Sequence, residues 1–322
     1  MDLTVITVCR NAASTLPRCI DSVFPVLSAT GLSAEHIIID GASVDGTVEL
    51  LEKELHQKRI TRYISEPDTG IYEAMNKGIR MASGTVCVFI NADDEMCADA
   101  AEVCCRPILN GTADYSVSTA RVITTEGKLL RLWKPDFDQI WVGVPYCHQT
   151  LYCRTEILRA LGGFRTDLRI AADTALIYDL YREGYRHAII SKETAIFRTG
   201  GSSDSKHTFS EQINLILEYS AHSLKRAESD TAYAVSALKI LFYHLNRYFL
   251  HFGIHKRDIL ILRALKLHRS IAELLPAQMR LSIRRRYQLK ATTNRLLSFI
   301  PGKNKKKHLS RAYSYACMAT FC

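Results

Sequence analysis

The stretch "TVCVFINADDEM" (residues 85–96) decides the fold, because it combines a buried strand with an acidic end. From Val86 to Ile90 it is apolar without a break, which predicts a strand covered on both faces. Asp93 and Asp94 follow shortly afterwards. Adjacent carboxylates repel each other and are costly to bury, so a divalent cation that both could share, Mg²⁺ or Mn²⁺, would explain the pair.

The elements before this stretch alternate between strands and helices, which predicts a parallel sheet with helices on both faces. Ligands bind such sheets beyond the carboxyl ends of the strands. Asp40 ends the second predicted strand, so it should lie near Asp93 and Asp94 in one crevice. The predicted strands are 3–9, 36–40, 60–65 and 85–91, and the predicted helices are 14–27 with Ser14 as N-cap, one ending near 57, and 71–82.

The rest of the chain divides into a mixed region and a helical region. Residues 113–200 are expected to complete the first domain, whereas the chain beyond residue 207 reads as helices. We therefore predict an α/β domain over 1–220 and a helical tail over 221–322. The predicted strands are 115–123, 128–133, 148–153, 186–190 and 194–198, and the helices are 155–161, 171–183, 207–226, 230–252, 257–275 and 278–298.

The charge of the chain is unevenly distributed along its 322 residues. Residues 1–220 contain 22 Lys and Arg against 29 Asp and Glu, a net charge of −7. Residues 221–322 contain 20 against 4, a net charge of +16, and the whole chain carries +9. A mildly acidic body with a strongly basic tail indicates two parts with different partners.

Several classes of protein are excluded or disfavoured by what the sequence lacks. The chain has no P-loop, no G-x-G-x-x-G, no H-E-x-x-H and no G-x-S-x-G motif. Its ten cysteines form no C-x-x-C pair, which favours reduced, buried thiols in a cytoplasmic setting. Met1 leads directly into a strand, and no run of 18 uncharged apolar residues occurs, so we expect neither a signal peptide nor a transmembrane helix.

Six motifs occur in order along the first two thirds of the chain. Together they resemble family-2 glycosyltransferases of the GT-A fold, in the branch that builds bacterial surface polysaccharides, over roughly residues 1–205. The resemblance implies a nucleotide-sugar-binding fold with a mixed, mainly parallel sheet. The motifs are "LTVITVCRN" (3–11), "IIIDGASVDGT" (37–47), "SEPDTGIYEAMNKGI" (65–79), "VFINADD" (88–94), "HQTLYCR" (148–154) and "GGFRTDLRIAADTALIYDL" (162–180).

This resemblance assigns roles to five residues of the donor site. Asp94 would ligate the metal, and Asp93 would contact the ribose or share the metal. Asp40 would hydrogen-bond a uracil-type base, and the backbone of Val8 would line the base pocket. Lys77 would offset negative charge on the pyrophosphate. The implied reaction is a metal-dependent, inverting transfer from a nucleoside-diphosphate sugar, with UDP as the default nucleotide, to a hydroxyl of a saccharide or lipid-linked saccharide.

A base for this reaction is predicted at Asp173. In a helix it shares a face with Leu176, Ile177 and Leu180, so it should point inward, where a carboxylate is a better base. The family usually has Glu-Asp here, and this chain has Ala172 before the Asp. An Asp in the first turn of a helix is also favoured by the helix dipole, which is compatible with catalysis.

The acceptor side and a later loop give further candidates. By the same resemblance, His148 and Gln149 belong to the acceptor site, although a lone His is more often structural. Many relatives bring a His to the pyrophosphate from a later loop, but "FRTGGSSDS" (197–205) has none. Thr199, a backbone group or water would substitute, or His207 would reach back.

The acids also have structural explanations. Asp94 or Glu95 could cap a helix that begins near residue 98. Asp40 precedes Gly41 and could shape its loop through an Asx turn, and for Asp45 this structural role is the favoured one. The position two residues before Asp93 is often acidic in the family but is Asn91 here, which argues against a three-acid site.

The basic tail is predicted to lie on an anionic membrane surface at the inner face of the plasma membrane, where lipid-linked acceptors occur. The helices over 235–252 and 257–275 have apolar stripes with basic residues beside them, and "RRR" (284–286) and "KNKKKH" (303–308) follow. Alternatively, the stripes pack on the catalytic domain. Binding of nucleic acid is not expected, because no recognition fold or stacking motif is visible.

Two functions from different classes follow. The first is a metal-dependent inverting glycosyltransferase. The second is a non-catalytic nucleotide-sugar-binding relative, in which the missing Glu and His mark lost chemistry. A third interpretation is a nucleic-acid-binding protein whose basic tail makes the contacts. It predicts steeply salt-dependent affinity for DNA or RNA.

Overall fold

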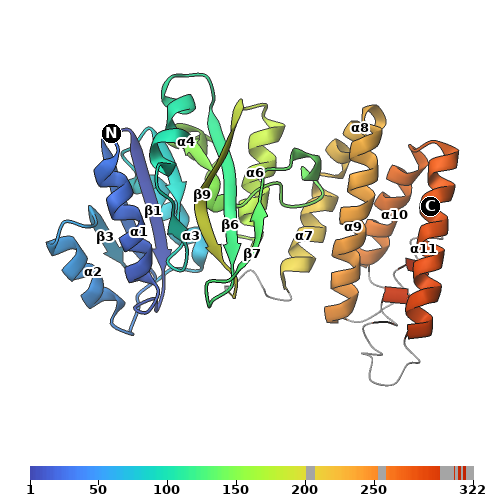
Figure 1. The fold of residues 1–322 in the computed structure, drawn as a ribbon, viewed down its shortest axis with the longest axis horizontal. Helices are drawn as coiled ribbons and strands as arrows, with labels where there is room; N and C mark the ends of the chain where they lie inside the picture. Colours follow the sequence, from blue (N-terminus) through green and yellow to red (C-terminus); the bar gives the residue numbers. More distant parts are fainter. Residues whose placement is uncertain (201–206, 253–258, 298–307, 309–310, 313–314, 317–322) are drawn as a thin grey trace. The chain divides into compact units, whose positions relative to one another are not determined.

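The computed structural model describes residues 1–200, 207–252, 259–297, 308, 311–312 and 315–316. The chain forms two compact units (Figure 1). The first contains Met1–Pro135 and Tyr146–Asp204, and the second contains Asp136–Pro145 and Ser205–Cys322. The extent of the catalytic domain in the functional sense stays a prediction.

The first unit is built around one mixed sheet, as predicted. Its strands follow the order β3-β2-β1-β4-β8-β6-β9-β5, with β7 paired to β6. The four strands of the predicted β-α-β-α-β-α-β segment run parallel, and β8 pairs antiparallel with β4 and β6. The strands are β1 Leu3–Cys9, β2 Ala34–Asp40, β3 Arg62–Ser65, β4 Val86–Phe89, β5 Glu95–Met96, β6 Tyr115–Ile123, β7 Leu129–Trp133, β8 Tyr152–Arg154 and β9 His187–Arg198.

Helices cover both faces of this sheet, which explains why β1 and β4 are buried at every position. Leu3 and Val5 of β1 belong to a core that also contains Ile20 of α1. Ile6 serves the other face, where Gly78 of α3 lies so close that an added Cβ would overlap the Ile6 side chain. The helices of this unit are α1 Leu16–Ala29, α2 Thr47–His56, α3 Ile71–Met81, α4 Ala100–Leu109, α5 Thr155–Ala160 and α6 Ala172–Arg182, with a 3₁₀ turn η2 at His148–Thr150.

Several local predictions were wrong in detail. Residues 148–153 do not form one strand, because η2 precedes the short β8. Residues 186–190 and 194–198 form the single strand β9, whose pairing with β6 shifts register between them. Thr15 and not Ser14 precedes α1, and its side chain makes no capping hydrogen bond. The two-residue strand β5 has no signal in the sequence, since strands this short show no periodicity.

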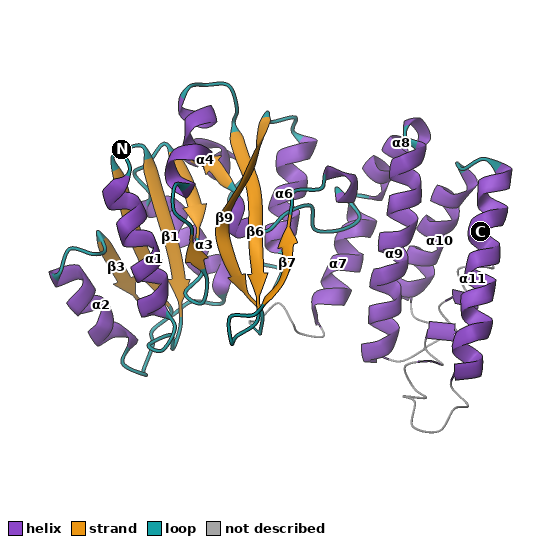
Figure 2. Cartoon of the chain, in the orientation of Figure 1, coloured by secondary structure: helices purple, strands orange, loops and turns teal. Residues whose placement is uncertain are grey.

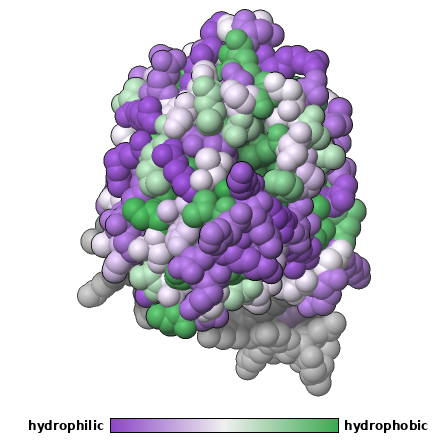
Figure 3. All heavy atoms as spheres, turned by 90° about the vertical axis from the view of Figure 1, so that its left-hand side faces the viewer, coloured by the Kyte–Doolittle hydropathy of each residue, from purple (hydrophilic) through white to green (hydrophobic). Residues whose placement is uncertain are grey.

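The strand β3 forms one edge of the sheet, and α2 packs against it. Figure 3 views the molecule from this side and shows a mostly hydrophilic surface with scattered apolar patches. Arg59, in the turn before β3, and Arg62, the first residue of β3, pair with Glu54 and Glu35 from other elements. Charged side chains at an edge strand hinder pairing with another chain.

The cysteines that the structure describes are free, as the sequence predicts, and most are buried. Burial raises the pKa of the Cys19 and Cys87 thiols to about 12. These thiols therefore stay protonated at neutral pH and act as small apolar side chains.

The second unit is helical in its described part (Figure 2). Ala234, Leu238 and Leu241 of α9 are buried, and α9 packs against α7, α8 and α10 of the same unit. Its apolar stripe thus forms the core of the second unit. No helix in the described part of the chain is long and apolar enough to cross a bilayer. The elements are η1 Phe137–Gln139, α7 His207–Glu218, α8 Ser220–Ser229, α9 Thr231–Phe252, α10 Ile259–Glu273 and α11 Ala277–Leu297.

Candidate active site

The carboxyl ends of β1, β2 and β4 meet at one edge of the sheet, as predicted. Cys9 of β1 pairs with Asp40 of β2, and Ile6 of β1 pairs with Phe89 of β4. The segment 91–94 therefore leaves the sheet on the same edge as Asp40. This edge is where the sequence places the donor site.

The side chain of Asp94 is buried at this edge of the sheet and is only 1% exposed. Gln149 Nε2 donates to Oδ2 at 2.5 Å, and the backbone N–H of Arg198 donates to Oδ1 at 2.9 Å. Burial, and then the charge of Asp93, raise the pKa of Asp94 well above its usual value. Asp94 thus joins three segments that are far apart in the sequence, the ends of β4 and β9 and the turn η2. That it also ligates a metal stays a prediction.

The alternative explanation of the acid pair as a helix cap is wrong. α4 begins at Ala100 after Asp99, and neither Asp94 nor Glu95 caps it. Glu95 instead accepts a hydrogen bond from Arg198 Nη2 at 2.6 Å.

Asp93 and Asn91 have unused oxygens at the same place. The Asp93 carboxylate is partly exposed and makes no hydrogen bond or ion pair with any described residue. Asn91 Oδ1 is buried without a hydrogen-bond partner among the described residues. Carboxylate and amide oxygens are ligands that Mg²⁺ and Mn²⁺ prefer. The described residues contain no cluster of three or more His, Cys, Asp or Glu that could hold a metal. These oxygens therefore fit a cation that takes its remaining ligands from substrate phosphates and water.

The predicted base lies beside the predicted acceptor residue. Asp173, in the first turn of α6, places Oδ2 at 3.3 Å from Nδ1 of His148, and its side chain is 20% exposed. Its Oδ1 accepts from the backbone N–H of Thr174 at 2.6 Å. His148 Nε2 lies 3.5 Å from Asn91 Nδ2. One chain of contacts therefore runs from Asp173 through His148 to Asn91, two residues before the acid pair.

The start of α6 is fixed by contacts from α3, which sequence reasoning did not assign. Asn76 donates from Nδ2 to the backbone oxygen of Phe164 at 2.7 Å, and its Oδ1 accepts from the Phe164 N–H at 2.7 Å. Tyr72 stacks on the Phe164 ring, and its hydroxyl donates to the backbone oxygen of Ile170. Asn76 and Tyr72 hold the segment that leads into α6 and thereby set the position of Asp173. The only signal for them was their place inside the motif over 65–79.

Two further donor-site residues predicted from the sequence, Asp40 and Lys77, have internal partners in this structure. Asp40 is fully buried, and accepts from the Ser65 hydroxyl at 2.6 Å and from the N–H and hydroxyl of Ser43. The loop-shaping role considered for Asp40 is therefore present. Lys77 is 8% exposed and donates at 2.9 Å to both the Pro67 oxygen and Glu66. Contact of Asp40 with a base, and of Lys77 with a pyrophosphate, stays a prediction.

The two remaining sequence predictions at this edge concern Val8 and Asp45. Val8 lies in β1, 6% exposed and paired with Ile39, so its lining of a base pocket stays a prediction. Asp45 accepts from the N–H and hydroxyl of Thr47, and the Thr47 hydroxyl is the main cause of its lowered pKa. Asp45 also accepts from Ala13 N–H, which confirms its structural role.

The residues considered as substitutes for the missing His lie partly within the described structure. Thr199 follows Arg198 at the end of β9, and its backbone N–H bonds to Ile123. β9 therefore brings the segment with Thr199 next to Asp94. The side chain of His207 lies outside the described part of the structure.

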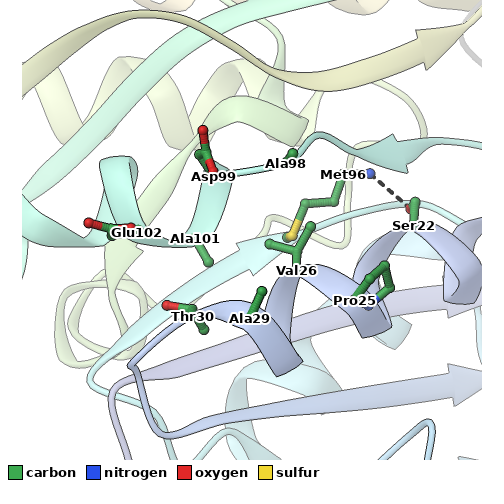
Figure 4. Close-up of a pocket in the computed structure, with 10 residues that line it drawn as sticks. All are labelled: Ser22, Pro25, Val26, Ala29, Thr30, Met96, Ala98, Asp99, Ala101 and Glu102. Atoms are coloured by element: carbon green, nitrogen blue, oxygen red, sulfur yellow. Dashed lines mark hydrogen bonds between the residues drawn. The ribbon is translucent and has the colours of Figure 1, made fainter.

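A separate hollow lies between α1 and the start of α4 (Figure 4). It has a volume of about 420 Å³, and Val26, Met96 and Ala101 line it, with Asp99 and Glu102 at one side. None of the predicted site residues lines this cavity. It is therefore distinct from the edge that holds the acid pair.

The mixed, mainly parallel sheet and the acids at its carboxyl edge define an α/β protein of the GT-A class. Residues 4–160 match the family described as glycosyl transferase family 2, and this segment belongs to that family. The resemblance to family-2 glycosyltransferases that the sequence motifs indicate is therefore confirmed over this segment.

The relatives and solved structures agree with this assignment. A PGL/p-HBAD biosynthesis glycosyltransferase of Mycobacterium bovis is 25% identical over 166 residues, which cover 51% of this chain and 63% of the relative. A chondroitin synthase of Pasteurella multocida is 30% identical over 121 residues, covering 37% of this chain and 12% of the relative. The chain thus spans about 63% of the length of this mycobacterial relative.

Two solved structures share the fold. TarS of S. aureus in complex with UDP-GlcNAc has a TM-score of 0.56 at 16% identity, covering 100% of this chain and 90% of that one. The mannosyltransferase PcManGT from Pyrobaculum calidifontis, in complex with GDP-Man and Mn²⁺, has a TM-score of 0.51 at 16% identity, covering 99% and 86%. At this identity the similarity shows the fold.

Proposed function

We propose that this chain is an inverting glycosyltransferase. It moves a sugar from a nucleoside-diphosphate sugar to a hydroxyl of a saccharide or lipid-linked saccharide in the synthesis of a bacterial surface glycan. The observation that supports this best is the chain of contacts from Asp173 through His148 to Asn91. It brings the predicted base within one side chain of the segment that carries the acid pair.

The donor side of the proposed site is the segment 91–94. Asp93 and Asn91 supply the oxygens with no partner among the described residues, so we assign the first metal ligand to Asp93. Asp94, held by Gln149 and the Arg198 N–H, fixes the position of this segment. Mg²⁺ or Mn²⁺ bound there would offset the negative charge of the donor pyrophosphate.

The acceptor side of the proposed site is the start of α6. Asp173 Oδ2 takes the proton of the acceptor hydroxyl while that oxygen forms its bond to the anomeric carbon. The bond from this carbon to the diphosphate oxygen breaks at the same time, and the nucleoside diphosphate leaves with the electron pair. His148 Nδ1 contacts this same oxygen, Oδ2, and thereby holds the Asp173 carboxylate in one orientation.

The choice of donor and acceptor is suggested by the relatives. UDP-GlcNAc is bound in the TarS complex, which makes UDP-sugars the first donors to test. The mycobacterial relatives are named for PGL/p-HBAD biosynthesis and the Pasteurella relative for chondroitin synthesis. These names support a saccharide or glycolipid acceptor for this chain.

The test is release of nucleoside diphosphate from a panel of nucleotide sugars with Mg²⁺ or Mn²⁺, repeated with EDTA and with Asp173→Asn. Release from one donor that EDTA and the variant both abolish would support the proposal. Metal-dependent binding of a donor without turnover, even with saccharide acceptors supplied, would favour the non-catalytic relative. If the protein neither binds any donor nor releases nucleoside diphosphate, the proposed site is overturned.

A further inference from the structure

We infer that the exposed face of α11 is a docking surface for anionic phospholipid headgroups. The inference concerns the second unit alone and goes beyond the proposed reaction. Its connection to a lipid-linked acceptor rests on the proposed function, but the binding itself does not.

The orientation of α11 follows from its contacts within the second unit. Tyr287 is 8% exposed, and its ring stacks on Phe242 of α9 with centroids 5.4 Å apart. His268 of α10 lies 6.1 Å from the same ring. Tyr287 therefore marks the side of α11 that faces its own unit, and the residues half a turn away face outward.

The outward side of α11 carries a stripe in which leucine and arginine alternate. Leu281, Arg285 and Leu289 are spaced by four residues, so they share one face of the helix. Leu281 is 52% exposed and Leu289 is 69% exposed, which is unusual for leucine in a helix with neighbours on its other side. Arg284 and Arg286 are exposed on the flanks of this stripe. We call these five residues the α11 stripe.

The charge of the α11 stripe has no counterpart in the described protein. Arg284, Arg285 and Arg286 make no ion pair or hydrogen bond with any described residue. After Glu273 the sequence contains eleven Lys and Arg and no Asp or Glu. Exposed arginines attract an anionic partner, and the leucines between them fit one with an apolar layer below its charge.

These features decide between possible partners. A nucleic acid would use the arginines but has no contact to offer two exposed leucines on the phosphate side. A second copy of α11 would bring Arg285 against Arg285 at the centre of the stripe, and like charges there oppose pairing. A bilayer surface with anionic headgroups satisfies both groups, because arginine remains at the headgroups while leucine enters the acyl boundary.

The experiment measures co-sedimentation of the full chain with vesicles, without donor or metal. Vesicles of phosphatidylglycerol mixed with phosphatidylcholine are compared with vesicles of phosphatidylcholine alone. The wild type should bind the anionic vesicles, bind less as salt is raised, and not bind the neutral ones. Arg284→Gln/Arg285→Gln should weaken binding about 10- to 30-fold, since each charge near the surface adds about 1 kcal/mol. Leu281→Ser/Leu289→Ser should weaken it about tenfold or more.

A matched control uses two exposed cations of α10. Arg263→Gln/Lys266→Gln removes the same charge from the same unit and should weaken binding less than about threefold, because separated charges are screened. Equal losses in both double variants would overturn the assignment to α11. Equal binding to neutral vesicles, or tighter binding to RNA that the same α11 variants abolish, would overturn it as well. Asp173→Asn should bind vesicles like the wild type, which separates this inference from the proposed reaction.

Discussion

Nδ1 of His148 lies 3.3 Å from Oδ2 of Asp173, although 24 residues and two elements, β8 and α5, separate them in the chain. His148 is in turn 3.5 Å from Asn91, so the histidine connects the start of α6 to the acid pair after β4. The contact turns two separate sequence candidates into one site. It also gives His148 a role that the sequence did not assign, which is to orient the carboxylate of the proposed base.

Asp173→Asn should abolish sugar transfer and leave donor binding intact. The amide keeps the shape of the side chain but does not accept the acceptor proton, so we expect a loss of about 10²- to 10⁴-fold in kcat. Calorimetric binding of nucleoside diphosphate with Mn²⁺ should change less than about twofold. Asp179→Asn, on the same helix, is the control and should retain activity. Comparable losses in both variants would contradict the assignment.

His148→Ala should lower kcat more than it raises KM for the donor, because it releases Asp173 from one orientation without removing the base. We expect a loss of about 10- to 100-fold in kcat. His148→Gln, which can still donate toward Asp173, should recover part of this loss. A positioning role is refuted if His148→Ala changes only the KM for the donor.

Asp93→Asn and Asp94→Asn should separate metal binding from stability. The Asp93 carboxylate is partly exposed and has no partner among the described residues, so its amide variant should lose metal-dependent nucleotide binding and keep the wild-type Tm. Asp94→Asn places an amide N–H against the Gln149 or Arg198 donor, which should cost about 1–3 kcal/mol of folding free energy. Titration with Mn²⁺ and thermal unfolding of both variants measure the two effects. A normal Tm for Asp94→Asn would show that its buried contacts are dispensable.

Gly163→Ala should destabilise the first unit and reduce transfer together. Gly163 has φ +73°, and an added Cβ would overlap Oδ1 of Asn76, which holds the segment before α6. We expect about 1–3 kcal/mol of destabilisation. Gly111→Ala is a matched control, because Gly111 has φ +76° and open space around it. Strain of the backbone alone predicts equal losses in both, whereas the contact with Asn76 predicts a larger loss at Gly163.

The stability of the first unit should fall in acid because of His36. Burial lowers the pKa of His36 to about 3, while its unfolded value is 6.5, so the unfolded chain binds the extra proton first. The neutral histidine therefore favours folding above pH 6.5. This contribution is lost as the pH falls toward 3, at up to about 1.4 kcal/mol per pH unit. Urea unfolding of the wild type and of His36→Gln between pH 7 and 4 measures the difference in slope. The exposed His56 provides the control His56→Gln, whose slope should match that of the wild type.

The order of strands and helices in the first unit could be predicted from sequence because its signals are local. The unbroken apolar run from Val86 to Ile90 and the turns rich in Gly and Asp between elements each depend on neighbouring residues. Parallel strands place their carboxyl ends at the same edge of the sheet. The location of Asp40 and the acid pair at one edge could therefore be predicted without knowledge of side-chain packing. The β5 strand and the turn η2 could not be predicted, because β5 pairs with β9 and Gln149 of η2 donates to Asp94, and both partners are distant in sequence.

The sequence by itself determined which residues gather at the carboxyl edge of the sheet, and only the tertiary structure decided what each of them does there. Asp93 and Asp94 are the same residue type side by side in the sequence. In the structure Asp94 is buried between Gln149 and Arg198, whereas the Asp93 carboxylate has no partner in the described part of the chain. Lys77 and Asp40 likewise have internal partners that no local pattern reveals. The physical reason is that burial and hydrogen-bond partners depend on contacts between distant segments, whereas periodicity records only neighbours along the chain.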